Sequence, residues 1–315
     1  MMRAVTVVDN HIEVRDHPDA EPAKGELLVR VRAAGLNRAD LMQVQGLYPS
    51  PPGSPPDIPG MELAGEVVAT GPGVTAFDAG DSVMALVGAG AQAELAVVHE
   101  RLAMRVPDGL GWPDAGGFPE VFLTAHDALF TRGQVSLGDR VLVHGAAGGV
   151  GTAGVQLAAA AGARVTASVR NRDAWDGVRQ LGAAEVVAHD DFADRGPFDM
   201  VLELVGAVNL AANQAALADQ GRIVIIGVGA GAKAELDMYS VMQKRASITG
   251  STLRYRPLEE KALVTRRAEA HVVPLLESGT VRVLVDERYP LEEAAAAYER
   301  FEQGGKLGKI VLLTD

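Results

Sequence analysis

The stretch that decides the fold is residues 140–169, RVLVHGAAGGVGTAGVQLAAAAGARVTASV. It opens with an apolar run over residues 140–144 that predicts a strand, and an alanine-rich run over residues 150–161 predicts a helix. A second strand is predicted at residues 164–169. A glycine-rich turn separates the first strand from the helix. This order of strand, turn, helix and strand predicts a βαβ unit of the dinucleotide-binding type.

The glycines of the turn explain how an acidic chain can hold a phosphate. Gly145 suits a tight turn, Gly148 lets the backbone approach a pyrophosphate, and Gly151 lets the helix pack closely on the strand. The free N–H groups at the helix start add a partial positive charge. An Ala/Gly-rich linker is the alternative, and the flanking strand and helix argue against it. The predicted cofactor contacts are Gly145, Ala147, Gly148, Gly149, Val150 and Gly151.

The end of the next strand indicates which dinucleotide binds. An NAD site usually carries an acid there to hold the ribose hydroxyls, whereas this chain has no acid until Asp173. Instead, Ser168, Arg170 and Arg172 offer a hydroxyl and two guanidinium groups, which suit a 2′-phosphate. The alternative is that both arginines are solvated loop charges. The sequence favours NADPH over NADH.

The rest of the chain divides into three parts. Residues 1–119 contain short β runs broken by Gly and Pro, which predict a compact β-rich domain. Residues 120–257 alternate strands with helices, which predicts a Rossmann domain with a doubly wound parallel sheet. Residues 258–315 are expected to return to the first domain and make it discontinuous. Within this last part the pattern predicts helices at residues 258–276 and 291–303, and strands at 281–285 and 309–313.

Composition excludes several classes of function. The net charge of −12 and the pI near 5.1 oppose binding to nucleic acid or to anionic membrane surfaces. The chain has no cysteine, which excludes disulfides, thiol nucleophiles and thiolate zinc sites. No run approaches the roughly 18 apolar residues of a membrane span, and the N-terminus lacks a signal pattern. We therefore expect a cytoplasmic enzyme with a small-molecule substrate.

Five motifs together resemble a known family. They are AGLNRADLMQVQGLYP (34–49), PGMELAGEV (59–67), LTAHDAL (123–129), HGAAGGVG (144–151) and GKLGKIVL (305–312). In this order they resemble the zinc-independent quinone oxidoreductases, the zeta-crystallin-like branch of the medium-chain dehydrogenase/reductase superfamily. The resemblance spans essentially the whole chain. It implies a discontinuous GroES-like domain, an active site between that domain and the Rossmann domain, and a homodimer joined near residues 246–250.

Two residues separate this chain from the zinc-dependent relatives. Where those relatives carry a cysteine ligand and a histidine before a glutamate, this chain carries Asn37 and Met61. An amide and a thioether do not replace a thiolate and an imidazole around zinc. We expect no metal, so the substrate should already be electrophilic, such as a quinone or an activated alkene.

The resemblance also implies roles for individual residues. Asn37 and Tyr48 match positions that line the nicotinamide and substrate cleft, and Tyr48 can donate to a developing oxyanion. For Tyr48 the alternative is a loop aromatic beside the proline run. Thr124 matches a cofactor contact or a helix cap, and Lys309 matches a residue facing the cofactor or a solvated lysine. His189 falls where relatives often carry a tyrosine beside the adenosine phosphate.

Gly227 and Val228 are predicted from topology to contact the cofactor. They follow an apolar run, RIVIIG, at the carboxyl edge of the parallel sheet, where ligands bind in open α/β sheets. In contrast, no pair of carboxylates among Asp40, Glu62 and Glu203 is singled out for acid–base work.

Three functional hypotheses remain. The first is NADPH-dependent reduction of quinones. The second is an enoyl or alkenal reductase, which needs a proton donor at the substrate α-carbon. The third is a non-catalytic NADPH-binding protein, as lens-crystallin relatives show is possible. The pair Asn37 and Tyr48 argues against the third, because binding alone does not need it.

Overall fold

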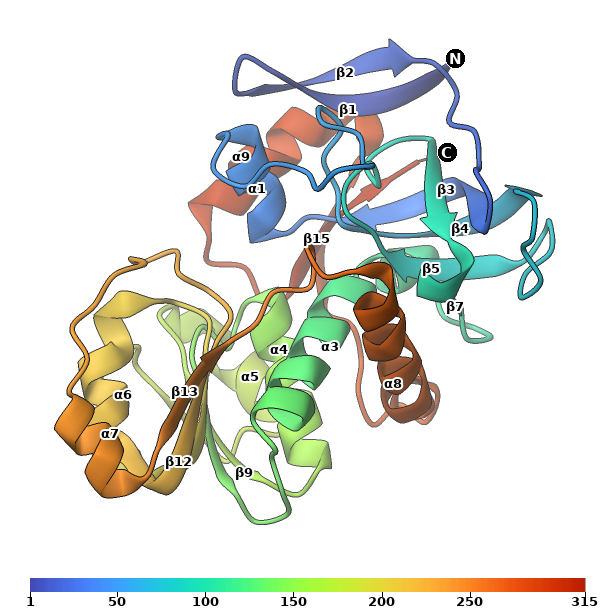
Figure 1. The fold of residues 1–315 in the computed structure, drawn as a ribbon. Helices are drawn as coiled ribbons and strands as arrows, with labels where there is room; N and C mark the ends of the chain where they lie inside the picture. Colours follow the sequence, from blue (N-terminus) through green and yellow to red (C-terminus); the bar gives the residue numbers. More distant parts are fainter. Residues whose placement is uncertain (315) are drawn as a thin grey trace.

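Two large β-sheets, beside a separate two-stranded hairpin, organise residues 1–314, the part of the chain that the computed structural model describes. One sheet has six strands, all parallel, and the other is β-rich, mostly antiparallel and built from both ends of the chain. Figure 1 shows the β-rich half at the top and the parallel sheet at the lower left, with α3 and α4 between them. The predicted fold class, a Rossmann sheet with a discontinuous GroES-like domain, is confirmed.

The parallel sheet has the strand order β10-β9-β8-β11-β12-β13. Its central strands are continuous apolar runs because helices cover both faces. Its strands are β8 (Arg140–Val143), β9 (Arg164–Ser168), β10 (Glu185–Val187), β11 (Phe198–Glu203), β12 (Leu217–Ile225) and β13 (Ser247–Gly250). Its helices are α4 (Gly149–Ala160), α5 (Trp175–Gln180), α6 (Leu210–Ala216) and α7 (Met238–Lys244). The sequence analysis predicted β8, α4 and β9 individually and the rest of this domain only as an alternation of strands and helices. Helix α7 has no buried residue.

The β-rich sheet has the order β14-β15-β3-β4-β5-β7, and β6 also pairs with β3. Its strands are β3 (Glu26–Gly35), β4 (Glu62–Thr70), β5 (Ser82–Leu86), β6 (Leu95–His99), β7 (Ala103–Arg105), β14 (Val285–Pro290) and β15 (Lys309–Leu313). Around it lie the hairpin β1 (Met2–Val8) and β2 (His11–His17) and the helices α1 (Arg38–Val44), α2 (Trp112–Gly116) and α9 (Ala294–Gln303). Because β15 pairs with β3, the C-terminal segment completes a sheet that the N-terminal segment begins.

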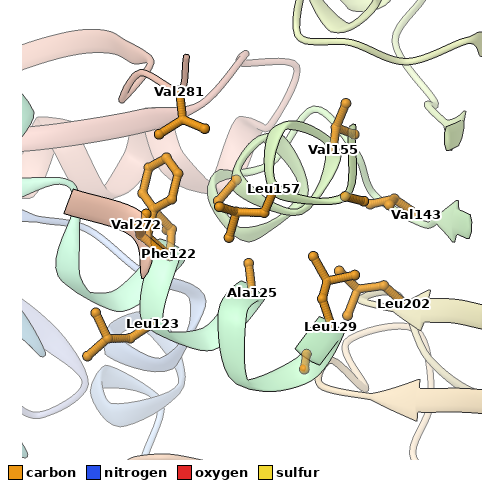
Figure 2. Close-up of a cluster of buried hydrophobic side chains, with 14 of the residues drawn as sticks. Phe122, Leu123, Ala125, Leu129, Val143, Val155, Leu157, Leu202, Val272 and Val281 are labelled. Carbon is orange, nitrogen blue, oxygen red and sulfur yellow. The ribbon is translucent and has the colours of Figure 1, made fainter. Parts of the chain in front are cut away.

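One predicted strand is wrong. Of the strand expected at residues 281–285, residues 281–284 lie outside every strand, and Val285 is the first residue of β14. The apolar signal came from Val281 and Val283, which are buried among helices rather than paired in a sheet. Figure 2 shows Val281 above the ring of Phe122. Burial without backbone pairing gives the same alternation of apolar residues as a strand.

Helix α3 (Pro119–His126) joins the two halves. Its buried side chains Phe122, Leu123 and Ala125 lie in one apolar cluster with α4 and the parallel sheet (Figure 2). The chain continues as one π-helical turn, Asp127–Arg132, and α8 (Leu258–Glu277) packs against α3. Because one core serves both halves, the position of α3 fixes how they face each other. Within residues 1–314, no helix combines the length and apolar character that crossing a membrane requires.

Candidate active site

A cavity of about 740 Å³ lies between the two halves. Its wall includes the glycine turn, the carboxyl ends of β11 and β12, the start of α1 and the C-terminal segment before β15. The residues predicted from sequence that line it are Asn37, Tyr48, Thr124, Gly145, Gly148, Gly149, Val150, Gly151, Arg170, Gly227, Val228 and Lys309. Ala147, Ser168, Arg172 and His189 are not on its wall. Segments more than 250 residues apart in sequence therefore meet at one site.

The glycine turn has room for a ligand on its cavity side. At Gly151 an added Cβ would lie 2.3 Å from the carbonyl oxygen of Gly145, so this glycine is needed for the protein's own packing. At Gly148 an added Cβ would meet only that same oxygen, at 3.4 Å, and would otherwise point into open space. Gly148 is also the N-cap of α4 and offers no side chain to the first-turn N–H groups. These residues fit a dinucleotide pyrophosphate.

Ala147 contributes to the turn through its backbone. Its carbonyl oxygen accepts a hydrogen bond from the Gly308 N–H at 2.8 Å, and Gly148 forms a parallel bridge with Gly308. Gly308 has a φ of +99° and lies against the Leu284 carbonyl, so only glycine suits this position. The C-terminal segment is thereby attached directly to the phosphate-binding turn.

The residues predicted to hold a 2′-phosphate separate in the structure. Arg170 is exposed and lines the cavity, whereas the Arg172 guanidinium lies over the Trp175 ring, 5.3 Å from its centroid. Ser168 is buried, and its hydroxyl lies 3.2 Å from Nδ1 of His144. His189 is exposed at the end of β10, with its Nδ1 3.7 Å from Asp190. Of these four, only Arg170 reaches the cavity.

Lys306 is a cation on the same wall that the sequence analysis missed. It lies above the Phe301 ring, 4.6 Å from its centroid, and donates to the Gly308 carbonyl at 2.6 Å. Burial and the nearby Lys309 lower its pKa to about 7. The adjoining Gly305 carbonyl accepts from Asn171 at 3.0 Å, so this segment lies beside Arg170. The motif GKLGKIVL contained Lys306, but its tertiary position had no local signal.

A charge cluster lies at the cavity wall beside the glycine turn; we define it as Asn37, Glu62, Glu120 and Lys309, and all but Glu62 line the cavity. The buried Lys309 ammonium donates to the Asn37 Oδ1 and the Leu36 carbonyl, both at 2.6 Å, and pairs with Glu62 Oε1 at 2.6 Å. Asn37 Nδ2 donates to the same Glu62 oxygen at 2.9 Å. The lysine is therefore a structural cation of the cluster, and the solvated alternative is wrong.

The second oxygen of Glu62 joins the cluster to α3. Glu62 Oε2 accepts from the backbone N–H of Glu120 at 2.8 Å, near the positive end of that helix. Beneath it, Asp40 accepts from the backbone N–H groups of Asn37 at 2.8 Å and Gly60 at 3.1 Å. Burial nevertheless raises the pKa of Asp40 to about 6. Asp40 fixes the loop that carries Asn37.

Glu120 is the second residue that the sequence analysis missed. Its carboxyl lines the cavity and accepts from the Thr124 hydroxyl at 3.3 Å, one helical turn later. Burial, and secondly the charge of Glu62, raise its pKa to about 7. The i, i+4 spacing to Thr124 was visible in sequence, but the burial that alters this carboxyl was not.

Tyr48 lies on the wall through contacts with a later segment. Its hydroxyl lies 3.0 Å from the Thr252 hydroxyl, and its ring meets that of Tyr255 edge-on at 5.1 Å. Arg254 lies over the ring at 5.0 Å and donates to the Tyr48 carbonyl at 2.9 Å. Burial raises the pKa of Tyr48 above its usual 10. At neutral pH it is a neutral hydrogen-bond donor.

The cluster does not fit a zinc ion. The oxygens of Asn37, Leu36 and Glu62 already surround the Lys309 ammonium, and the neighbouring Met61 offers only a weak thioether. Nowhere in residues 1–314 do three or more His, Cys, Asp or Glu side chains form a group suited to a metal ion.

Comparison with known proteins places this site in context. Residues 23–131 match the alcohol dehydrogenase GroES-like domain, and residues 181–312 match the zinc-binding dehydrogenase family. The human quinone oxidoreductase is 30% identical over 93% of this chain and 90% of its own. The solved structure of mycobacterial Rv1454c complexed with NADPH has a TM-score of 0.89 and 29% identity, covering 99% of this chain and 100% of that one. A thermostable alcohol dehydrogenase from Pyrobaculum aerophilum, bound to cobalt and zinc, has a TM-score of 0.85 and 27% identity, covering 99% of each chain.

A Rossmann half, a GroES-like half and a cavity between them define the class as an NAD(P)-dependent oxidoreductase. The chain belongs to the medium-chain dehydrogenase/reductase superfamily and is a quinone oxidoreductase-like enzyme of that superfamily. NAD(P)H is the typical cofactor of this family.

Proposed function

We propose that this enzyme reduces quinones, or related activated carbonyl and alkene acceptors, with NADPH. The observation that carries the proposal is the single cavity, whose wall contains both the phosphate-binding turn and three residues of the charge cluster. Reduced nicotinamide, when bound, supplies a hydride. The protein's part is to hold the dinucleotide along the cavity and to exclude water around the acceptor.

The wall near the charge cluster suits a flat, apolar acceptor. Leu36, Met42, Met61 and Leu253 give it apolar surface, and Tyr48 adds an aromatic ring with a hydroxyl. Asn37 is held from both sides by Glu62 and Lys309, so its amide is fixed in one orientation. Because the Asn37 amide and the Lys309 ammonium are already bonded to Glu62 and to each other, the Tyr48 hydroxyl is the group on this wall that suits donation to an acceptor oxygen.

The proposed preference for NADPH rests on Arg170 together with Lys306. Both lie on the cavity wall, and guanidinium and ammonium groups bind phosphate strongly. Because Lys306 has a pKa of about 7, a phosphate beside it should raise that pKa and cause proton uptake on binding. Arg172, Ser168 and His189, which do not line the cavity, remain proposed contacts through their position at the ends of β9 and β10.

A second candidate is an enoyl or alkenal reductase. The observation that favours it is the cavity-facing carboxyl of Glu120, because reduction of a carbon–carbon double bond needs a proton as well as a hydride.

The experiment that tests the function is stopped-flow oxidation of NADPH against a panel of quinones and 2-alkenals. We expect turnover with quinones, and the relative rates decide between the two reductase hypotheses. If no acceptor in either class is reduced while NADPH still binds, the third hypothesis, a non-catalytic NADPH-binding protein, replaces both.

We also propose a homodimer joined along the edge of the parallel sheet. Among residues 1–314, strand β13 pairs with β12 alone, so its other edge is open. The preceding α7 exposes Met238, Tyr239 and Met242 by 62–76%. Light scattering after size exclusion should give twice the chain mass. Replacing Tyr239 and Met242 by lysine should shift that mass to the monomer, and an unchanged dimer would place the interface elsewhere.

A further inference from the structure

Glu120 and Glu62 are neighbouring carboxylates with very different surroundings. Glu62 is wholly buried and is contacted by Asn37, Lys309 and a backbone N–H. Glu120 is partly exposed to the cavity, and within residues 1–314 the one hydrogen bond to its carboxyl comes from Thr124. Glu62 is thus held in place by its partners, whereas Glu120 lines the cavity with a single hydrogen bond to its carboxyl.

The groups around Glu120 come from four elements. Glu62 from β4 and Asp40 from α1 make its ionisation harder, while Lys309 from β15 and Thr124 from α3 make it easier. Burial is the largest effect, and the resulting pKa of about 7 means that both forms are populated at neutral pH. A general acid works best when its pKa lies near the working pH.

Tyr48 is the alternative donor on the same wall. Its pKa is raised above 10, and its hydroxyl already contacts Thr252. Proton transfer from such a group leaves a phenolate near Glu120, whose charge disfavours it. Tyr48 therefore suits hydrogen bonding, and the carboxyl suits proton transfer.

We propose that Glu120 is the general acid that protonates the acceptor during reduction, an inference that rests on the proposed function. The O–H bond of the carboxyl breaks, and a new bond forms from that proton to the α-carbon of an enone or to a quinone oxygen. The electron pair for the reduction comes from the hydride of NADPH. Glu120 is left as a carboxylate, and water returns its proton after the product leaves.

The test compares Glu120→Gln with wild type, and Glu277→Gln is the control because it makes the same change at an exposed residue outside the cavity. In wild type, kcat should fall as pH rises through about 7, since the acid must be protonated. E120Q should lose that pH dependence and be slower by about 10²–10⁴-fold. Its affinity for NADPH, measured by fluorescence, should stay within about twofold of wild type. E277Q should match wild type throughout.

A second readout does not depend on turnover. In cofactor-free protein labelled with ¹³C at the glutamate carboxyl, one resonance should titrate near pH 7 and be missing in E120Q. Aspartates such as Asp40 are silent in this experiment. If E120Q fails to fold, the wild-type titration still decides, because the absence of any glutamate titrating between pH 6 and 8 overturns the proposal.

The outcomes separate the inference from the function beneath it. If E120Q turns over as fast as wild type and its kcat still decreases near pH 7, Glu120 is not the general acid. The proposed reductase function is then unaffected. No turnover by wild type with any acceptor overturns the proposed function, and the general acid with it.

Discussion

The phosphate-binding turn and the charge cluster, which both contribute to the cavity wall, are built in opposite ways. The turn is a backbone feature, in which the five residues 144–148 lead from β8 into α4 and include no Asp, Glu, Lys or Arg. The charge cluster is a side-chain feature, in which Asn37, Glu62, Glu120 and Lys309 come from four distant segments. A backbone site is specified by local sequence, and a side-chain cluster depends on the whole fold.

The difference also concerns energy. The glycine turn holds an anion with N–H groups that every helix start possesses, so it costs the fold little. The charge cluster buries several ionisable groups, and each stays favourable only while its partners are present. We therefore expect substitutions at the cluster to act mainly on stability and proton transfer, and substitutions at the turn to act mainly on cofactor binding.

The largest effect is expected from Lys309→Met. It leaves Glu62 buried without its cation, and breaking a buried ion pair in this way costs about 3–5 kcal/mol in the free energy of unfolding. Urea denaturation measures it. The control Lys233→Met, at an exposed position, should change stability by less than about 0.5 kcal/mol. Equal effects of the two variants would show that the cluster does not stabilise the fold.

Next is a gain in stability for Glu120→Gln at alkaline pH. In the folded state the pKa of the Glu120 carboxyl is about 7, above its usual 4.5, so the folded protein binds this proton more tightly than the unfolded chain does. As the pH rises above 4.5, the stability of wild type therefore decreases. E120Q should therefore equal wild type near pH 4 and become more stable by about 3 kcal/mol at pH 8. Unfolding at both pH values measures this. A constant difference would contradict the raised pKa.

The two glycines of the turn should respond differently to alanine. Gly151→Ala forces a Cβ against the Gly145 carbonyl and should cost about 1–3 kcal/mol of stability. Gly148→Ala meets open space, so stability should change by less than about 1 kcal/mol, while NADPH affinity falls at least about tenfold because the Cβ occupies the ligand's approach. Calorimetry and fluorescence titration separate the two. If G148A binds NADPH like wild type, the pyrophosphate does not approach at this glycine.

The smallest effect concerns the choice of cofactor. Arg170→Ala should weaken NADPH binding about tenfold, or about 1.4 kcal/mol, and leave NADH unchanged, because only NADPH carries the 2′-phosphate. Arg172→Ala should have a smaller effect, since its guanidinium lies over Trp175. Arg164→Ala is the control, at the opposite end of β9. If wild type binds NADH more tightly than NADPH, the proposed preference for NADPH is wrong.

Sequence reasoning was most successful where a pattern is periodic or local. It placed β8, α4 and β9 within about one residue, and it brought Asn37, Tyr48 and Thr124 to the cavity through family resemblance. It failed at residues 281–284, where the buried Val281 and Val283 give the apolar alternation of a strand. It gave no sign that the Ser168 hydroxyl lies beside His144, because that contact joins two segments that are distant in sequence.

The sequence by itself determined the βαβ unit, the absence of thiol chemistry and the glycine turn, because each depends on residues that are close together or on composition alone. Only the tertiary structure decided that Lys309 is the cation between Asn37 and Glu62, and that Glu120 has a pKa near neutrality. The physical reason is that a carboxyl's proton affinity depends on burial and on charges brought from distant segments. Those contacts form only when β15 returns to β3.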